Sequence, residues 1–93
     1  MEKTVLVGVI TNDQGYEKSM DYLEELEFLT VTAGGFVNKI FTQKLNNPNP
    51  KTFIGEGKIN EIRDYIKDHD VKTVIFDDEL TATQERNISK IFN

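Results

Sequence analysis

Apolar residues along the chain form short β-branched runs that alternate with longer stretches of helical spacing. The first run, residues 4–10, is continuous and rich in Val and Ile, which is typical of a strand buried on both faces. Further strands are predicted at residues 36–42, 52–54 and 71–76. The alternation of strand and helix patterns predicts a small layered α/β domain with a roughly four-stranded, mostly parallel sheet and about three helices.

Three helices are predicted between and after these strands. The first is expected to run from an N-cap at Ser19 to about Ala33, before the glycine pair 34–35. Its apolar residues recur at intervals of three or four and are expected to face the core: Met20, Leu23, Leu26 and Leu29, with Tyr22 and Phe28 beside them. The second helix is predicted up to about Asp68. The third opens with a capping box at residues 81–84.

Composition limits the class of protein. Ninety-three residues are enough for one small domain, and 38% hydrophobic with 29% charged residues is a globular balance. The sequence holds no cysteine, no apolar run long enough to cross a bilayer and no signal-peptide pattern at its start. We therefore expect a cytoplasmic domain without a membrane partner. The helical pattern is still running at residues 91–93, so the chain is expected to belong to a longer protein.

Charge is unevenly distributed along the chain. The formal net charge is −5, which by itself disfavours a nucleic-acid partner. Residues 34–60, however, hold four lysines (Lys39, Lys44, Lys51 and Lys58) against Glu56 alone. This basic segment is either a solvated loop region or a surface that contacts phosphates, and the sequence leaves both interpretations open.

A glycine-rich turn lies inside the basic segment, at Gly55-Glu56-Gly57-Lys58. A phosphate-binding P-loop requires four residues between its glycines and a Ser or Thr after the lysine, whereas here one residue separates the glycines and Ile59 follows. The third glycine of a dinucleotide-binding fingerprint is also missing. The turn is therefore either structural or a simple anion site at a helix start, where free N–H groups and the helix dipole attract negative charge.

Three acids, Asp77, Asp78 and Glu79, follow the last predicted strand. Carboxylates at the carboxyl end of a strand in an open α/β sheet are weak candidates for a Mg²⁺ site. The alternative is that they stabilise the start of the next helix through its dipole. No catalytic residue is predicted.

Several segments resemble the N-terminal domain of HflX-type GTPases over nearly the whole of residues 1–93. The most specific are P-N-P-K-T-F-I-G-E-G-K at residues 48–58 and V-I-F-D-D-E-L at residues 74–80. Residues 19–26, 32–34 and 84–87 also match.

The resemblance implies a longer parent protein with a linker and a GTPase domain that binds GTP and Mg²⁺. It implies that the parent acts on the large ribosomal subunit in ribosome splitting or rescue, and that this domain engages ribosomal RNA. Candidate phosphate or RNA contacts are then Lys44, Lys51, Gly55, Gly57 and Lys58. The 93-residue chain itself is expected to need no cofactor and to hydrolyse no GTP. The alternatives are a mononucleotide-binding domain and a purely structural or regulatory domain for the adjacent GTPase.

Overall fold

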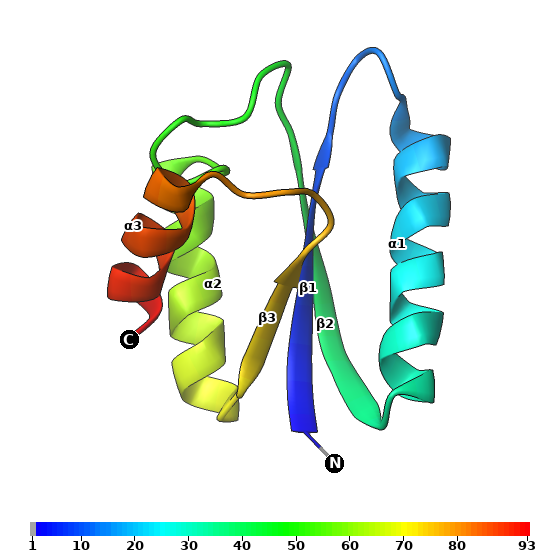
Figure 1. Ribbon diagram of the computed structural model, residues 1–93, viewed down its shortest axis with the longest axis vertical. Helices are drawn as coiled ribbons and strands as arrows, with labels where there is room; N and C mark the ends of the chain where they lie inside the picture. Colours follow the sequence, from blue (N-terminus) through cyan, green and yellow to red (C-terminus); the bar gives the residue numbers. More distant parts are fainter. Residues whose placement is uncertain (1) are drawn as a thin grey trace.

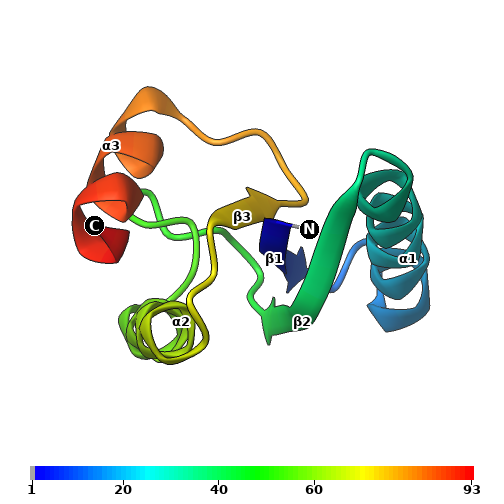
Figure 2. The ribbon, with the colours of Figure 1, turned by 90° about the horizontal axis from the view of Figure 1, so that it is seen from below.

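The computed structural model describes residues 2–93, which form three strands and three helices in alternating order. The elements are β1 (Glu2–Ile10), α1 (Tyr16–Thr32), β2 (Gly35–Lys44), α2 (Glu56–His69), β3 (Thr73–Phe76) and α3 (Ala82–Phe92). The strands form one parallel sheet in the order β2-β1-β3. Helix α1 covers one face of the sheet, and α2 and α3 lie on the other (Figures 1 and 2). The predicted α/β class with a parallel sheet is confirmed.

Strand β1 is the centre of the molecule. Val5, Leu6 and Val7 are 0–1% exposed, as the continuous apolar run predicts. Successive side chains of a strand point to opposite faces, so Val5 and Val7 join the core beneath α2, and Leu6 faces α1. On the α1 side a Cβ at Gly8 would lie 2.8 Å from Leu23 Cδ1, so the missing side chain allows α1 to pack closely on the strand.

The larger core lies between the sheet and α2. It is built from aliphatic residues of α2 and β1 together with two buried aromatic side chains, Phe41 and Phe53. Phe53 meets the Phe76 ring edge-on with centroids 5.6 Å apart, and Phe41 meets Tyr65 in the same way at 5.5 Å. Among the described residues, no helix has the length and apolar character needed to cross a membrane.

The start of α1 differs from the prediction. The helix begins at Tyr16, with Gly15 as its N-cap at φ 82°, a left-handed conformation that favours glycine. Ser19 is therefore inside the helix and not at its cap. It is 2% exposed, and its Oγ accepts a hydrogen bond of 2.8 Å from Gln14 Nε2. Serine is more common than glycine at N-caps, although both occur there, so the prediction placed the helix start at Ser19 and not at Gly15.

The expected apolar stripe of α1 is only partly buried. Leu23 is buried, whereas Tyr22, Leu29 and Phe28 are 43%, 55% and 69% exposed. A step of three residues turns a helix by about 300°, so residues spaced by three drift around its axis and leave the buried face. The core role predicted for Tyr22, Phe28 and Leu29 is thus wrong.

Residues 52–54 do not form the short third strand that the sequence predicted. They belong to a tight turn in which Asn49 and Phe53 exchange backbone hydrogen bonds of 2.8 and 2.9 Å, an isolated bridge outside the sheet. Asn49 Oδ1 accepts the N–H of Lys51, and Phe53 adopts φ 68°, which breaks an extended conformation. The apolar character of Phe53 and Ile54 reflects burial under α2 and α3 instead of strand pairing.

We expect Phe53→Ala to lower the free energy of unfolding by about 3–5 kcal/mol, because it leaves a cavity where a 2% exposed ring now contacts Phe76. The matched control is Phe28→Ala, which removes a ring that is 69% exposed and should change stability by less than about 0.5 kcal/mol. Chemical denaturation monitored by circular dichroism measures both. Equal losses in the two variants would contradict the described packing.

Candidate functional site

The loops that follow the three strands meet at one edge of the molecule. Because the strands are parallel, their carboxyl ends and the starts of all three helices lie on the same side (Figure 1). We call this side the carboxyl edge; it comprises residues 11–16, 44–58 and 77–81. The predicted phosphate-contact residues and the three predicted acids all fall within it.

Helix α2 begins at the carboxyl edge without a side-chain cap. Gly55 is its N-cap in an extended conformation, and the Gly55 N–H donates a 2.8 Å hydrogen bond to Gln43 Oε1. The N–H groups of the first helical turn, from Glu56 to Lys58, have no partner within their own helix. A Cβ at Gly57 would meet no atom within 4 Å, so the turn opens on free space. This is the geometry of an anion site at a helix start.

The loop before α2 is held from the side by α3. Gln84 Nε2 donates to the Asn49 carbonyl at 2.8 Å, and Asn87 Nδ2 donates to the Lys51 carbonyl at 3.0 Å. Gln84 also completes the predicted capping box, accepting the Thr81 N–H at 2.9 Å through Oε1. The loop is therefore fixed in place by contacts 35 and 36 residues distant in sequence. Sequence reasoning identified Gln84 as part of a cap but missed its second role, and it missed Gln43 and Asn87 altogether.

Three of the four lysines of the basic segment lie at the carboxyl edge. Lys44 ends β2, Lys51 is exposed in the loop, and Lys58 is in the first turn of α2 with its Nζ 3.6 Å from Glu61 Oε1. Lys39 is separated from them. Its Nζ lies 4.9 Å from the ring centre of Phe41 and 5.3 Å from that of Tyr65, in the middle of β2.

A hollow of about 440 Å³ adjoins Lys44 at the same edge. Its wall carries the side chains of Thr11, Tyr16 and Thr42 as well as Gly15, the N-cap of α1. A lysine, three hydroxyl-bearing residues and a helix start without a side-chain cap are all groups that attract anions. This second helix start was missed because the sequence placed the α1 cap at Ser19.

The three predicted acids lie on the β3 side of the carboxyl edge but do not converge. Within residues 2–93, no group of three or more His, Cys, Asp or Glu side chains is arranged to hold a metal ion. Asp78 Oδ1 accepts the N–H of Glu79 at 2.7 Å. Burial raises the pKa of Asp77 above its ordinary value of 3.8, and the neighbouring carboxylates of Asp78 and Glu25 raise it further.

The chemistry of the edge is thus divided. The lysines and the free helix N–H groups belong to the connection between β2 and α2, whereas the carboxylates of residues 77–79 belong to the loop after β3. Cations, amide N–H groups and hydroxyls bind phosphate oxygens without carrying out a reaction. The arrangement is suited to holding an anionic backbone on one side and to repelling it on the other.

The comparisons with known proteins agree with the sequence resemblance. The family described as GTP-binding GTPase N-terminal matches residues 20–93. The chain is 56% identical over 92 residues to the GTPase HflX of Flavobacterium psychrophilum, a match that covers 99% of this chain and 22% of that protein. It is 36% identical over 90 residues to the GTPase HflX of Escherichia coli, covering 97% and 20% of the two proteins.

A third relative gives the same result. The GTPase HflX of Caldanaerobacter subterraneus is 38% identical over 87 residues, which are 94% of this chain and 19% of that protein. The chain thus spans about a fifth of the length of these relatives. With a family match over residues 20–93 and this identity along nearly its whole length, the chain belongs to the family of HflX GTP-binding proteins as their N-terminal domain.

Proposed function

We propose that this domain docks onto ribosomal RNA of the large subunit through the β2–α2 side of its carboxyl edge, within a longer GTPase that acts on that subunit in ribosome splitting or rescue. The observation that carries the proposal is the uncapped start of α2, with Lys58 in its first turn and Lys44 and Lys51 on the segment that leads to it. In the longer protein, GTP and Mg²⁺ belong to the separate GTPase domain.

The geometry supports contact with a phosphate backbone in two ways. The loop at residues 45–55 is fixed to α3 by Gln84 and Asn87, so little ordering would be needed when RNA binds. The Lys58–Glu61 pair is a partly exposed ion pair, so a phosphate can replace Glu61 as the partner of Lys58 at small cost.

The division of charge at the edge favours one orientation. A backbone that followed the start of α2 and the loop before it would meet Lys51 and Lys58, whereas Asp77 and Asp78 belong to the separate loop after β3. The overall charge of −5 would oppose non-specific binding along the rest of the surface. Docking should therefore be local and strongly dependent on salt.

Two other functions remain to be separated from docking by experiment. A mononucleotide-binding domain would use the Gly55–Lys58 turn for a nucleotide phosphate and the acids Asp77, Asp78 and Glu79 for Mg²⁺. A structural or regulatory domain would contact the adjacent GTPase domain and need no RNA. The spacing of the glycines and the scattered positions of the acids argue against the mononucleotide-binding domain. The structural or regulatory domain is tested by measuring RNA binding after the GTPase domain has been removed.

We expect Lys51→Gln combined with Lys58→Gln to weaken co-sedimentation of the 93-residue chain with purified large ribosomal subunits. Each lysine that neutralises a phosphate should contribute about one unit to the slope of log affinity against log salt, so the slope should fall by about two. Sedimentation at two salt concentrations measures this.

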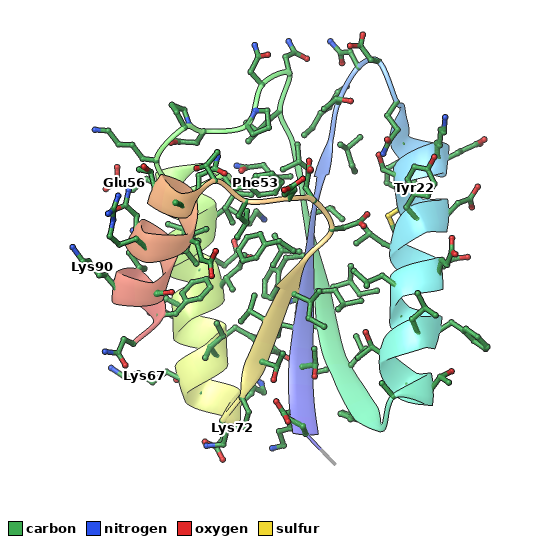
Figure 3. The ribbon with its side chains drawn as sticks, in the orientation of Figure 1. Tyr22, Phe53, Glu56, Lys67, Lys72 and Lys90 are labelled. Carbon is green, nitrogen blue, oxygen red and sulfur yellow. The ribbon has the colours of Figure 1, made fainter. Side chains whose placement is uncertain are left out.

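Lys67→Gln is the matched control, because Lys67 lies in the last turn of the same helix, away from the carboxyl edge (Figure 3). It removes one lysine charge by the same Lys-to-Gln change and should leave binding and slope unchanged, whereas each of the two edge lysines should lower the slope by about one unit. Equal losses in the control and the double variant would mean a general charge effect. If the double variant bound as tightly as the unsubstituted chain, the proposed docking surface would be ruled out.

The 93-residue chain should bind no GTP. The turn at residues 55–58 is too short to wrap a triphosphate, and Ile59 stands where a P-loop needs a hydroxyl for Mg²⁺. Calorimetric titration with GTP and Mg²⁺ should give only the heat of dilution. A saturable signal that Lys58→Gln abolishes would establish the mononucleotide alternative instead.

The raised pKa of Asp77 gives a pH-dependent expectation. A carboxyl whose pKa is higher in the folded than in the unfolded protein binds its proton more tightly when folded, so its contribution to stability falls as pH rises from about 3.8 through the raised value. Asp77→Asn should therefore increase the free energy of unfolding at pH 7 and lose this advantage at pH 3. Denaturation at both pH values measures the difference. If Asp77→Asn were less stable than the unsubstituted chain at pH 7, the ionised Asp77 carboxylate would not be destabilising in the folded protein.

A further inference from the structure

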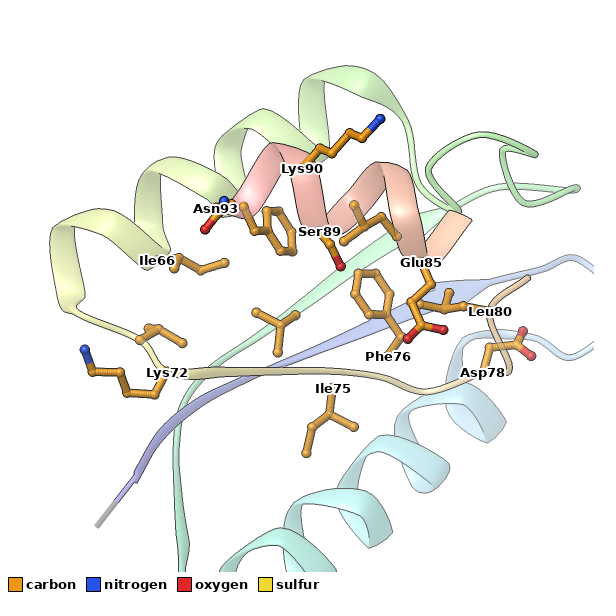
Figure 4. Close-up of a pocket in the computed structure, with 14 residues that line it drawn as sticks. Ile66, Lys72, Ile75, Phe76, Asp78, Leu80, Glu85, Ser89, Lys90 and Asn93 are labelled. Atoms are coloured by element: carbon orange, nitrogen blue, oxygen red, sulfur yellow. The ribbon is translucent and has the colours of Figure 1, made fainter. Parts of the chain in front are cut away.

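Two apolar regions of the domain reach its surface. One is a hollow of about 800 Å³ between β3, α2 and α3, and Figure 4 shows the apolar side chains that point into it. Phe76, Ile88 and Phe92 line this hollow and also pack with the main core, so it is an opening into the core. The other region is the outer face of α1, whose apolar side chains point to solvent and take no part in that core.

Helix α1 carries most of the exposed apolar side chains. It stands alone on its face of the sheet, because α2 and α3 lie on the opposite face (Figures 1 and 2). Within residues 2–93, six large apolar or aromatic side chains are exposed, and five of them belong to this helix: Tyr16, Tyr22, Phe28, Leu29 and Val31. Single exposed apolar side chains need no explanation, but several on one helix indicate an interaction surface.

The same helix carries most of the net negative charge. Helix α1 has a formal net charge of −4 from five acids and one lysine, and the whole chain has −5, so all other residues together sum to −1. Among the described residues, none of these five carboxylates forms an ion pair. The one lysine, Lys18, has its Nζ 5.9 Å from the centre of the Tyr22 ring. The outer face of α1 therefore attracts a cationic partner and repels RNA and anionic membranes.

The acids and the apolar residues follow one another along a single stripe of α1. Glu17, Asp21, Glu24, Phe28 and Val31 succeed each other at intervals of four, three, four and three residues, which places them on one face of the helix. All five are exposed. We call this row the α1 stripe. It is about 21 Å long, acidic in its first half and apolar in its second half.

We propose that the α1 stripe binds a helical polypeptide segment that has apolar side chains in its first half and arginine or lysine in its second half, packed antiparallel to α1. In this orientation the basic half meets the three acids, and the apolar half meets Phe28 and Val31. The order also suits the partner helix, because cations are stabilised near a helix C-terminus. A parallel partner would need its cations at its own N-terminus, where the helix dipole opposes them. This inference does not depend on the docking proposal.

A second copy of the chain does not have the required chemistry. Antiparallel pairing of two α1 stripes would set the acids of each copy against Phe28 and Val31 of the other, which takes carboxylates out of water without giving them a partner. Parallel pairing would set acids against acids, and like charges at an interface are repulsive. The occupant must therefore supply cations that this helix does not have.

Two fluorescently labelled peptides of about fifteen residues, which match the length of the stripe, test the proposal. They have identical composition: the first has leucines in its first half and arginines in its second, at helical spacing, and the second has these halves exchanged. Fluorescence anisotropy with the longer protein should show at least about tenfold tighter binding of the first peptide, because only that peptide buries Phe28 while its arginines meet the acids. Equal affinities would indicate charge attraction alone and would overturn the proposal. Tight binding by the 93-residue chain but not by the longer protein would overturn it in favour of a segment of the longer protein as the occupant.

A variant pair tests whether the peptide binds at the α1 stripe. Phe28→Ala removes the ring that is 69% exposed and should weaken binding of the first peptide by at least about tenfold. Phe36→Ala is the matched control, because Phe36 is also exposed, at 46%, but lies in β2. It should leave the affinity for both peptides unchanged. Unchanged binding by Phe28→Ala, or an equal loss in the two variants, would place the peptide elsewhere and overturn the proposal.

Discussion

Burial of β1 on both of its faces is the constraint on which the rest of the molecule depends. Val5 and Val7 anchor the layer that contains α2, and Leu6 faces the layer of α1. A strand with apolar side chains on both faces must be covered on both, and in a chain this short the covering elements are the helices that connect it to its neighbours. Those connections make the sheet parallel, and a parallel sheet brings all helix starts to one edge.

This arrangement explains why binding chemistry gathers where it does. The carboxyl edge holds backbone N–H groups that no helix can satisfy internally, and the sequence leaves α2 without a capping side chain there. The same edge carries lysines on the side of β2 and carboxylates on the side of β3. In the docking that we propose, charge of both signs within one edge would give the domain a preferred orientation towards an anionic partner, which its overall negative charge would not suggest.

Much of the fold could be predicted from local patterns, because these elements are specified locally. The continuous run of β1 and the capping box of α3 were both read correctly, down to the reciprocal hydrogen bonds of Thr81 and Gln84. The predictions failed where the residue type that usually marks an element did not determine the local structure. Gly15 took the cap position that Ser19 was expected to fill, and Phe53 entered the left-handed region despite its high preference for strands.

The part of the candidate site that local sequence signals specify could also be predicted. The Gly55–Lys58 turn is visible in the sequence because glycine spacing is a local signal, although its use for RNA is still a proposal. The side chains that fix the surrounding backbone, Gln43 and Asn87, act through contacts with distant residues and leave no local pattern. The hollow beside Lys44 was also hidden, since its walls come from the loop after β1 and the end of β2.

The double use of Gln84 explains why an amide occupies this position. A capping box accepts either Glu or Gln at its third helical residue, because both offer an oxygen to the cap N–H. Here the other end of the side chain must donate to the Asn49 carbonyl, and a carboxylate has no hydrogen to give. Glutamate would direct two electron-rich oxygens at each other in a position that is only 5% exposed. Replacing the amide by a carboxylate, which helix capping alone would tolerate, is therefore unfavourable here because of a loop thirty-five residues away.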